Sequence, residues 1–302
     1  MEMFNKKELD KRIGPLKKSK NLDGLEQVEG YVIRKCSELG IETSYDVLAE
    51  EMPYFKTMAY TEFATSFYFQ PLNVKLRNEM MIDAYNDNVK NPDDWSSYLV
   101  GNVLKKNANK YEDRKEKTKQ WPAKDCLVVL PGSNKVKTNV CLNRLQSISK
   151  THGDDVYFKP HPITTHQIVG ELKDFFGEEN ILPKDVDMYY YLQKADHVYT
   201  THLSESAIYA AVLGKSISPV DVWNNIQHGS FACINNHLFT NQKNVKEYIN
   251  RCFSSPKSGI INPAVDKDWK KKVDQYMEYI CEKRNVYENW FIDNRKPKQQ
   301  KK

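Results

Sequence analysis

The clearest chemical potential in this sequence lies in a Lys-Pro-His-Pro turn at residues 159–162. The apolar run Val156–Phe158 before it predicts a buried strand, which the two prolines must end. The turn therefore brings the amine of Lys159 and the imidazole of His161 to the carboxyl end of a strand, where open α/β sheets bind ligands. Both groups can donate hydrogen bonds to a phosphate oxygen, and a protonated imidazole would neutralise a leaving phosphate.

A second turn of this kind follows the apolar run at residues 126–130. It reads Pro-Gly-Ser-Asn-Lys, in which Gly132 allows close backbone approach, Ser133 supplies a hydroxyl and Lys135 supplies a charge. These are groups that hold a phosphate or an acceptor, although an ordinary strand-to-helix turn has the same composition. The loop is not a Walker loop, because the sequence lacks GxxxxGK[ST], and no GxGxxG is present either.

A third turn follows the predicted strand at residues 197–201. Ser204 or Ser206 can cap the helix that comes next, whose first amides would then point at a ligand beside the cationic turn. A helix cap with no ligand has the same sequence, so these serines indicate a phosphate site only in combination with the neighbouring turns.

The elements that must position these turns alternate between strand and helix. Strands are predicted at 126–130, 156–158, 181–182, 197–201 and 216–220, and helices at 139–150, 165–176, 187–193 and 206–213. This alternation predicts a doubly wound α/β domain. In such a sheet the carboxyl ends of parallel strands share one edge, which would bring the three turns together.

The flanking segments have a different character. Residues 1–120 read as irregular and helical, with helices at 25–39, 45–51 and 74–85 and an aromatic cluster between Tyr54 and Phe69 that we interpret mainly as core. A long amphipathic helix from Trp269 to about Tyr287 precedes a basic tail. We therefore predict an acceptor-side domain at 1–120, a nucleotide-sugar-binding doubly wound domain at 121–265, and a crossing helix with its tail at 266–302.

Composition sets broader limits. The 302 residues are 40% hydrophobic and 28% charged, which is typical of a water-soluble globular protein. No run of about eighteen apolar residues predicts a membrane span, and the first residues do not resemble a signal peptide. Six scattered cysteines without a CxxC pair predict buried thiols in a reducing compartment. The net charge of +5 is concentrated at the two ends, which suits either solvated tails or attraction to a polyanion.

The Lys-Pro-His-Pro turn, the strand at 195–200, Ser204 and the Ala-Val-Leu-Gly-Lys segment at 211–215 together resemble the carboxyl-terminal half of GT-B glycosyltransferases. They are most similar to the capsule-polysaccharide and sialyltransferase-like members, whose His-Pro motif and downstream serine contact a nucleotide-sugar donor. The resemblance covers residues 125–220. It implies two Rossmann-like domains, the first one reduced and mostly helical here, with a carboxyl-terminal helix that crosses back. It also implies that His161 and Ser204 bind the donor phosphate, with help from Lys159.

This chain departs from the family's pattern in two respects. Many relatives carry a glutamate shortly before the Gly-Lys pair, whereas this chain has Tyr209 there and Glu205 directly after Ser204. The acidic motif that supplies the general base in sialyltransferase-like enzymes has no clear counterpart in the first half. Asp46 and Glu62 are candidates for this base, because they lie among apolar or aromatic neighbours.

The implied function is metal-independent transfer of a sugar from a nucleotide-sugar co-substrate to a hydroxyl group, with no cofactor. Charge that grows on the departing phosphate would be stabilised by Lys159, His161 and the helix that follows Ser204. The Asp-Val-Asp string at 185–187 resembles the metal-binding string of other glycosyltransferases, but it opens a predicted helix, so we interpret it as a cap.

The acceptor is open at this stage. The composition, with 18 tyrosines, resembles that of large lytic bacteriophage proteins, and such phages glycosylate hydroxymethylated bases of their DNA with GT-B enzymes. Double-stranded DNA is then the acceptor, and the protein acts in the cytoplasm, the host's for a phage. The alternatives are a glycosyltransferase of capsule or lipopolysaccharide glycans, and a catalytically inactive GT-B-like binding protein.

Overall fold

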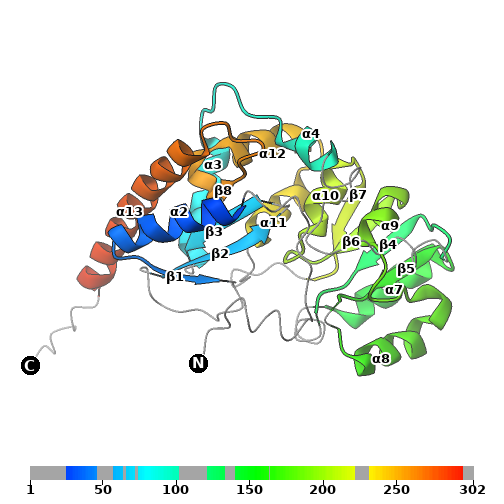
Figure 1. Cartoon of the computed structure of the whole chain (residues 1–302). Coiled ribbons are helices and arrows are strands. Elements are labelled where there is room, and N and C mark those ends of the chain that lie inside the picture. Colours follow the sequence, from blue (N-terminus) through cyan, green and yellow to red (C-terminus); the bar gives the residue numbers. More distant parts are fainter. Residues whose placement is uncertain are drawn as a thin grey trace, which may run out of the picture.

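The computed structural model of the chain describes residues 25–45, 57–63, 66–71, 74–101, 121–132, 140–162, 164–221 and 231–294. In this part of the chain two four-stranded sheets lie between helices (Figure 1). One sheet is built by the middle of the chain, and the other combines strands from the first quarter with a short strand near residue 260. The protein is therefore α/β, as the sequence predicts.

The first of these sheets is wholly parallel, with the order β5-β4-β6-β7. A parallel bridge between Phe158 and Ile181 adds one more strand position outside β5. In chain order the neighbours then read 3-2-1-4-5, which is the order of a Rossmann-like sheet. The strands are β4 (Cys126–Val129), β5 (Val156–Lys159), β6 (His197–Thr200) and β7 (Ser216–Pro219), all at positions that the sequence predicts.

The two faces of this sheet belong to different core clusters because side chains alternate along each strand. In β4, Val128 packs on the face covered by α7 (Leu142–His152) and α8 (His166–Phe176), while Leu127 packs on the opposite face. On the α8 face Phe158 stacks on Phe176 with ring centroids 4.3 Å apart. The opposite face is covered by α9 (Met188–Lys194) and α10 (Ser206–Val212).

Helix α7 begins later than the sequence predicts. Residue 139 was expected to open it, but Val140 forms an antiparallel bridge with Asp221, and Cys141 precedes the first helical residue. The stretch after Asp221 is also more regular than expected. It contains the helices α11 (Ala232–Thr240) and α12 (Val245–Ser254), the short helical turn η4 (Pro256–Ser258) and the strand β8 (Ile260–Ile261). A further helical turn, η3 (Glu178–Asn180), precedes the Ile181 bridge.

The second sheet corrects the prediction of a mostly helical first part. Its order is β1-β2-β3-β8, with β1 and β2 parallel and the other pairs antiparallel. Strand β1 includes Tyr45, so the helix predicted to begin there is wrong at its start, and residues 46–51 lie outside the described residues. The bounds of the strands from this part are β1 (Glu42–Tyr45), β2 (Thr57–Phe63) and β3 (Ser66–Pro71).

The last helix, α13 (Trp269–Asn294), lies beside α2 (Leu25–Glu38) in Figure 1, at the opposite end of the molecule from α7 and α8. The two helices share a core cluster in which Val28 of α2, Tyr276 of α13 and Phe69 of β3 are buried. The last helix thus packs on elements from the first quarter of the chain.

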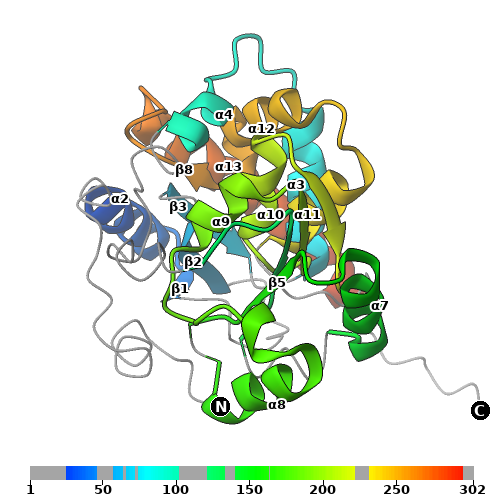
Figure 2. The same cartoon turned by 90° about the vertical axis from the view of Figure 1, so that its right-hand side faces the viewer.

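Two helices of the first part connect this region with the parallel sheet. They are α3 (Val74–Asn86) and α4 (Trp95–Tyr98), and Figure 2 shows α4 beside α12 at the top of the molecule. Trp95 is fully buried and meets Phe253 of α12 edge-on, with ring centroids 5.4 Å apart. Tyr68 of β3 belongs to the same core cluster as Leu127 of β4. One apolar core therefore continues from one sheet to the other.

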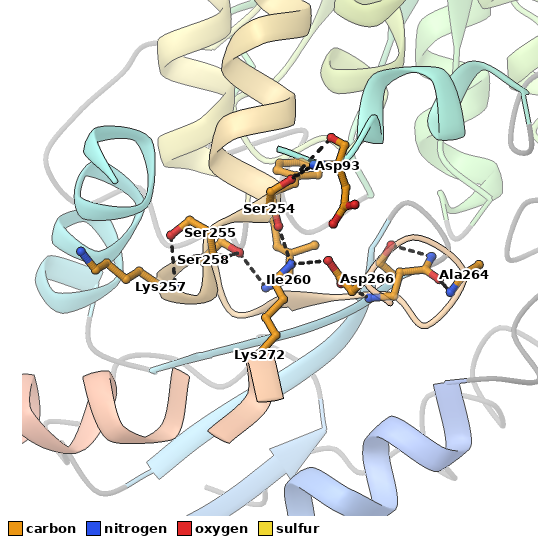
Figure 3. Close-up of polar contacts among 12 residues, drawn as sticks. Asp93, Ser254, Ser255, Lys257, Ser258, Ile260, Ala264, Asp266 and Lys272 are labelled. Carbon is orange, nitrogen blue, oxygen red and sulfur yellow. Dashed lines mark hydrogen bonds and ion pairs between the residues drawn. The ribbon is translucent and has the colours of Figure 1, made fainter. Parts of the chain in front are cut away.

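A buried ion pair fixes the start of α13 (Figure 3). The ammonium of Lys272 lies 2.8 Å from Oδ1 of Asp266 and donates to the carbonyl of Phe253 at 2.6 Å. Burial lowers the pKa of Lys272 and raises that of Asp266, and each shift is opposed by the charge of the partner. Because buried charges are tolerated only with such partners, the pair ties α13 to the end of α12.

The cysteines agree only partly with the sequence prediction. Cys36, Cys126 and Cys252 are buried, while Cys141 is exposed. Burial raises the pKa of Cys36 and of Cys126 to about 12. These buried thiols therefore stay protonated and act as small apolar groups. The basic ends, residues 1–24 and 295–302, lie outside the described residues.

Candidate functional site at the carboxyl edge of the parallel sheet

The parallel sheet brings the predicted turns to one edge. In the pairing of β4 with β5, Val129 lies opposite Lys159, and in the pairing of β4 with β6, Val128 lies opposite Tyr199. The three strands therefore end at the same level, with β4 in the middle. Neighbouring strands are about 4.8 Å apart, and β4 lies between β5 and β6, so the turns after β5 and β6 are separated by two such spacings, roughly 10 Å. This edge is also the point where the strand order reverses, where Rossmann-like sheets bind ligands.

The two groups predicted in the turn after β5, His161 and Lys159, differ in their burial. His161 is half-buried, and its carbonyl accepts a hydrogen bond from the amide of Thr164 at 2.9 Å. Lys159 is only 3% exposed, and its ammonium donates to the carbonyls of Pro160 at 2.8 Å and Lys184 at 2.9 Å. Lys159 therefore joins its own turn to the segment after Ile181, which differs from the direct phosphate contact that the sequence suggested.

The turn after β4 is described only at its start. Leu130 donates its amide to the carbonyl of Lys159 at 3.0 Å, which keeps the two turns side by side beyond the ends of their strands. Gly132 is buried. Ser133 and Lys135, the other two groups predicted in this loop, lie outside the described residues.

The turn after β6 carries a chain of hydroxyl groups. The Oγ1 atom of Thr200 lies 3.0 Å from Oγ of Ser206, which lies 2.6 Å from Oγ of Ser204. Thr200 and Ser206 are buried, whereas Ser204 is half-buried and is the outermost of the three. The amide of Ser206 donates to Oγ of Ser204 at 3.3 Å. Helix α10 begins at Ser206, and the capping position before it is Glu205, whose side chain makes no capping hydrogen bond, so the prediction that Ser204 or Ser206 is the cap is wrong. Ser204 is the most exposed of the three hydroxyl-bearing residues.

Helix α10 also shows how this chain differs from the motif it resembles. Tyr209 is 1% exposed, and its hydroxyl donates to the carboxylate of Glu205, one turn earlier, at 2.5 Å. Burial, together with the neighbouring Glu205, raises the pKa of Tyr209 well above its usual value. The tyrosine is therefore a neutral donor that holds Glu205 against the first turn of the helix.

Three buried or half-buried groups around the Ser204 turn were not predicted from the sequence. His202 follows β6 within the turn itself, Asp221 follows β7, and Asn235 lies in α11. Asp221 accepts hydrogen bonds from the backbone and ring of His202, and Asn235 donates to two carbonyls of the same turn. The only sequence signal was a histidine and an aspartate placed directly after two predicted strands.

The two candidates for a general base are not placed at this edge by the described residues. The backbone of Glu62 belongs to β2, where it pairs with Phe67 in the other sheet, and its side chain lies outside the described residues. Asp46 lies outside them altogether.

The Asp-Val-Asp string is confirmed as a helix cap. The carboxylate of Asp187 accepts the amide of Tyr189 at 2.9 Å, at the start of α9. Within the part of the chain that the structure describes, histidine, cysteine, aspartate and glutamate side chains form no group of three or more that could hold a metal ion. Among the same residues, no helix combines the length and the apolar surface needed to cross a bilayer.

Comparison with known proteins gives no relative: no family model, no curated protein and no solved structure matches this chain.

Proposed function

We propose that the carboxyl edge of the parallel sheet binds the phosphate of a nucleotide sugar and that the protein is a glycosyltransferase of the GT-B type. The observation that supports the proposal is that the turns after β5 and β6 lie at the same edge of the sheet, on either side of β4. His161 after β5 and Ser204 after β6 are both half-buried and flank the end of β4. A ligand above β4 can therefore contact both.

The chemistry follows from these two groups. In the transfer, the oxygen of the acceptor hydroxyl forms a bond to the sugar carbon and gives up its proton to a carboxylate from the first part of the chain. The bond between the sugar carbon and the phosphate oxygen breaks, and its electron pair stays with the phosphate, whose negative charge grows. The imidazole of His161 and the hydroxyl of Ser204 donate hydrogen bonds to that charge. Lys159 supports the reaction indirectly, because its ammonium fixes the turn that carries His161. The proposed transfer uses no metal.

The test is a calorimetric screen of the purified chain against CMP, UDP and GDP sugars. We expect one nucleotide class to bind and His161→Ala to lower its affinity about tenfold or more, as expected for loss of a charge-assisted hydrogen bond. His166→Ala is the matched control, because His166 is an exposed histidine of the same segment. The proposal is wrong if the wild-type chain binds none of these nucleotides, or if both variants bind as the wild type does.

Hydroxymethylated bases of phage DNA are the acceptor that we propose. The concentration of basic residues at both ends of the chain supports a polyanionic acceptor. Retention of the protein on duplex DNA that falls steeply as the salt concentration rises would support this choice. A protein that does not bind DNA but consumes its nucleotide sugar would instead act on a glycan. A chain that binds the nucleotide without transfer or hydrolysis would be an inactive binding protein.

A further inference from the structure

The turn that carries Ser204 is held by a buried carboxylate from another strand. Asp221 is 3% exposed, and its two oxygens each lie 3.1 Å from the backbone nitrogen of His202. Its Oδ1 atom also lies 2.7 Å from Nδ1 of the His202 ring, which is itself 2% exposed. Because an ionised carboxylate only accepts hydrogen bonds, Nδ1 carries the proton. Asp221 therefore fixes both the backbone and the ring of His202.

A second side chain, that of Asn235, holds the same turn through its backbone carbonyls. Nδ2 of Asn235 donates to the carbonyl of His202 at 2.9 Å and to that of Ser204 at 2.7 Å. Only the nitrogen end of the amide can donate to two carbonyls, so these contacts set the orientation of the side chain. Its Oδ1 atom is buried and has no hydrogen-bond partner among the described residues. A buried amide oxygen without a partner is unfavourable. The two hydrogen bonds that Nδ2 donates to the turn offset this cost.

Asp221 and Asn235 come from two different elements, both of which follow the turn in the sequence. Asp221 follows β7 and also forms the backbone bridge with Val140, where the loop after β4 ends. Asn235 lies in α11, and the ring of Phe239 one turn later packs edge-on against His202 with centroids 4.9 Å apart. The turn is therefore connected to α11 through Asn235 and, through Asp221, to the end of β7 and to Val140.

We propose that Asp221 and Asn235 are positioning residues that hold the Ser204 turn in the conformation that meets the donor phosphate. The proposal rests on the proposed nucleotide-sugar site. Neither residue needs to touch the ligand: Asp221 acts through His202, and Asn235 acts through the carbonyls on either side of Leu203. Loss of either contact lets the turn move and displaces the hydroxyl of Ser204.

The test compares Asp221→Asn with Asp266→Asn in the full-length chain. Asp266 is the matched control, because it is also a buried aspartate that is 4% exposed and paired with a cation, but it lies in the polar cluster of Figure 3 at the start of α13. Three quantities are measured for each variant: the midpoint of thermal unfolding, the affinity for the nucleotide that the wild type binds, and the hydrogen exchange of amides 201–206.

We expect Asp221→Asn to weaken nucleotide binding about tenfold and to accelerate exchange in residues 201–206, while Asp266→Asn lowers the unfolding midpoint and leaves both other quantities near wild type. Asn235→Ala, which keeps the Asp221–His202 pair, should likewise weaken nucleotide binding and accelerate exchange in residues 201–206. It provides the test if Asp221→Asn does not fold. Equal loss of affinity in the Asp221 and Asp266 variants would mean a merely structural role and overturn the proposal.

Failure of the proposed function is recognised separately. If the wild-type chain binds no nucleotide, the donor site is wrong, yet the exchange measurement still decides whether Asp221 and Asn235 position the turn. Unchanged exchange in residues 201–206 of both variants would refute the positioning role whatever the ligand is.

Discussion

A lysine beside a proposed phosphate site need not touch the phosphate, and Lys159 shows why. Its position next to His161 made it a direct ligand in the sequence-based prediction. In the structure its ammonium donates to the carbonyls of Pro160 and Lys184 and is almost completely buried. A strand that is buried on both faces leaves a long side chain at its end little access to solvent, and an ammonium in that place must find carbonyl oxygens.

The first prediction concerns this ammonium. Lys159→Met keeps the length of the side chain but removes the ammonium that donates to the carbonyls of Pro160, which is buried, and Lys184, which is half-buried, so we expect the free energy of unfolding to fall by about 2–4 kcal/mol. Urea unfolding measures this change, and the exposed Lys150→Met at the end of α7 should leave the free energy within about 0.5 kcal/mol. A variant with wild-type stability that has lost nucleotide binding would instead mean that Lys159 contacts the ligand directly.

At the scale of elements, the sequence predicted the parallel sheet well and the other sheet badly. Strands β4 and β5 are short, largely apolar runs, whereas β6 and β7 mix apolar and polar residues, and all four are followed within a few residues by proline or a polar turn, which is a strong local signal. Strand β3 is buried along its whole length, so its residues show no alternation, and its aromatic side chains were interpreted only as core. Strand β8 has two residues and is too short for any periodic signal.

The contacts around the Ser204 turn escaped prediction for a different reason. Asp221 lies 19 residues from His202, and Asn235 lies 33 residues from it. No local pattern connects residues at such separations, because the pairing depends on where β7 and α11 settle against β6. The turn residues could therefore be predicted as a site, but the side chains that hold them could not.

A prediction at the element scale concerns the docking of α13 on α3. Oδ2 of Asp83 lies 2.7 Å from the ammonium of Lys283 and accepts the hydroxyl of Tyr279 at 2.6 Å. Partial burial acts to raise the pKa of Asp83, but the hydrogen bonds from Lys283 and Tyr279 outweigh it and hold the pKa below its usual value. A carboxyl whose pKa is lowered on folding stabilises the protein above its unfolded pKa of about 3.9 and loses that contribution as the pH falls through the folded value.

Asp83→Asn should therefore lower the free energy of unfolding by about 1 kcal/mol at pH 7, as expected for a partly exposed ion pair. The difference from the wild type should shrink as the pH is lowered from 5 to about 3. Urea titrations at several pH values measure it, and the exposed Asp174→Asn in α8 is the control, with no significant effect at pH 7. A difference that stays constant down to pH 3 would show that the carboxylate does not stabilise the contact between α3 and α13.

At the scale of the whole molecule, the two sheets share one core. Tyr68 of β3, Trp95 of α4, Leu127 of β4 and Phe253 of α12 belong to a single buried cluster. Elements that bury their apolar surfaces against each other unfold together, because exposing one face exposes the other. The arrangement therefore favours one cooperative unit over two lobes that unfold independently, even though the chain builds two separate sheets.

Trp95→Ala tests this cooperativity. Trp95 is fully buried between Phe253 and the ammonium of Lys272, which lies 5.2 Å from the centre of its ring, so its removal should lower the free energy of unfolding by about 3–5 kcal/mol. If the core is shared, the whole chain should still melt in one calorimetric transition at a lower temperature, and amides of β4 and β6 should lose exchange protection together with those of β3. Val273→Ala, within the separate cluster between α2 and α13, is the comparison, with the smaller loss expected for a smaller cavity. Two resolved transitions, with the parallel sheet keeping wild-type protection in Trp95→Ala, would mean that the two sheets are independent units.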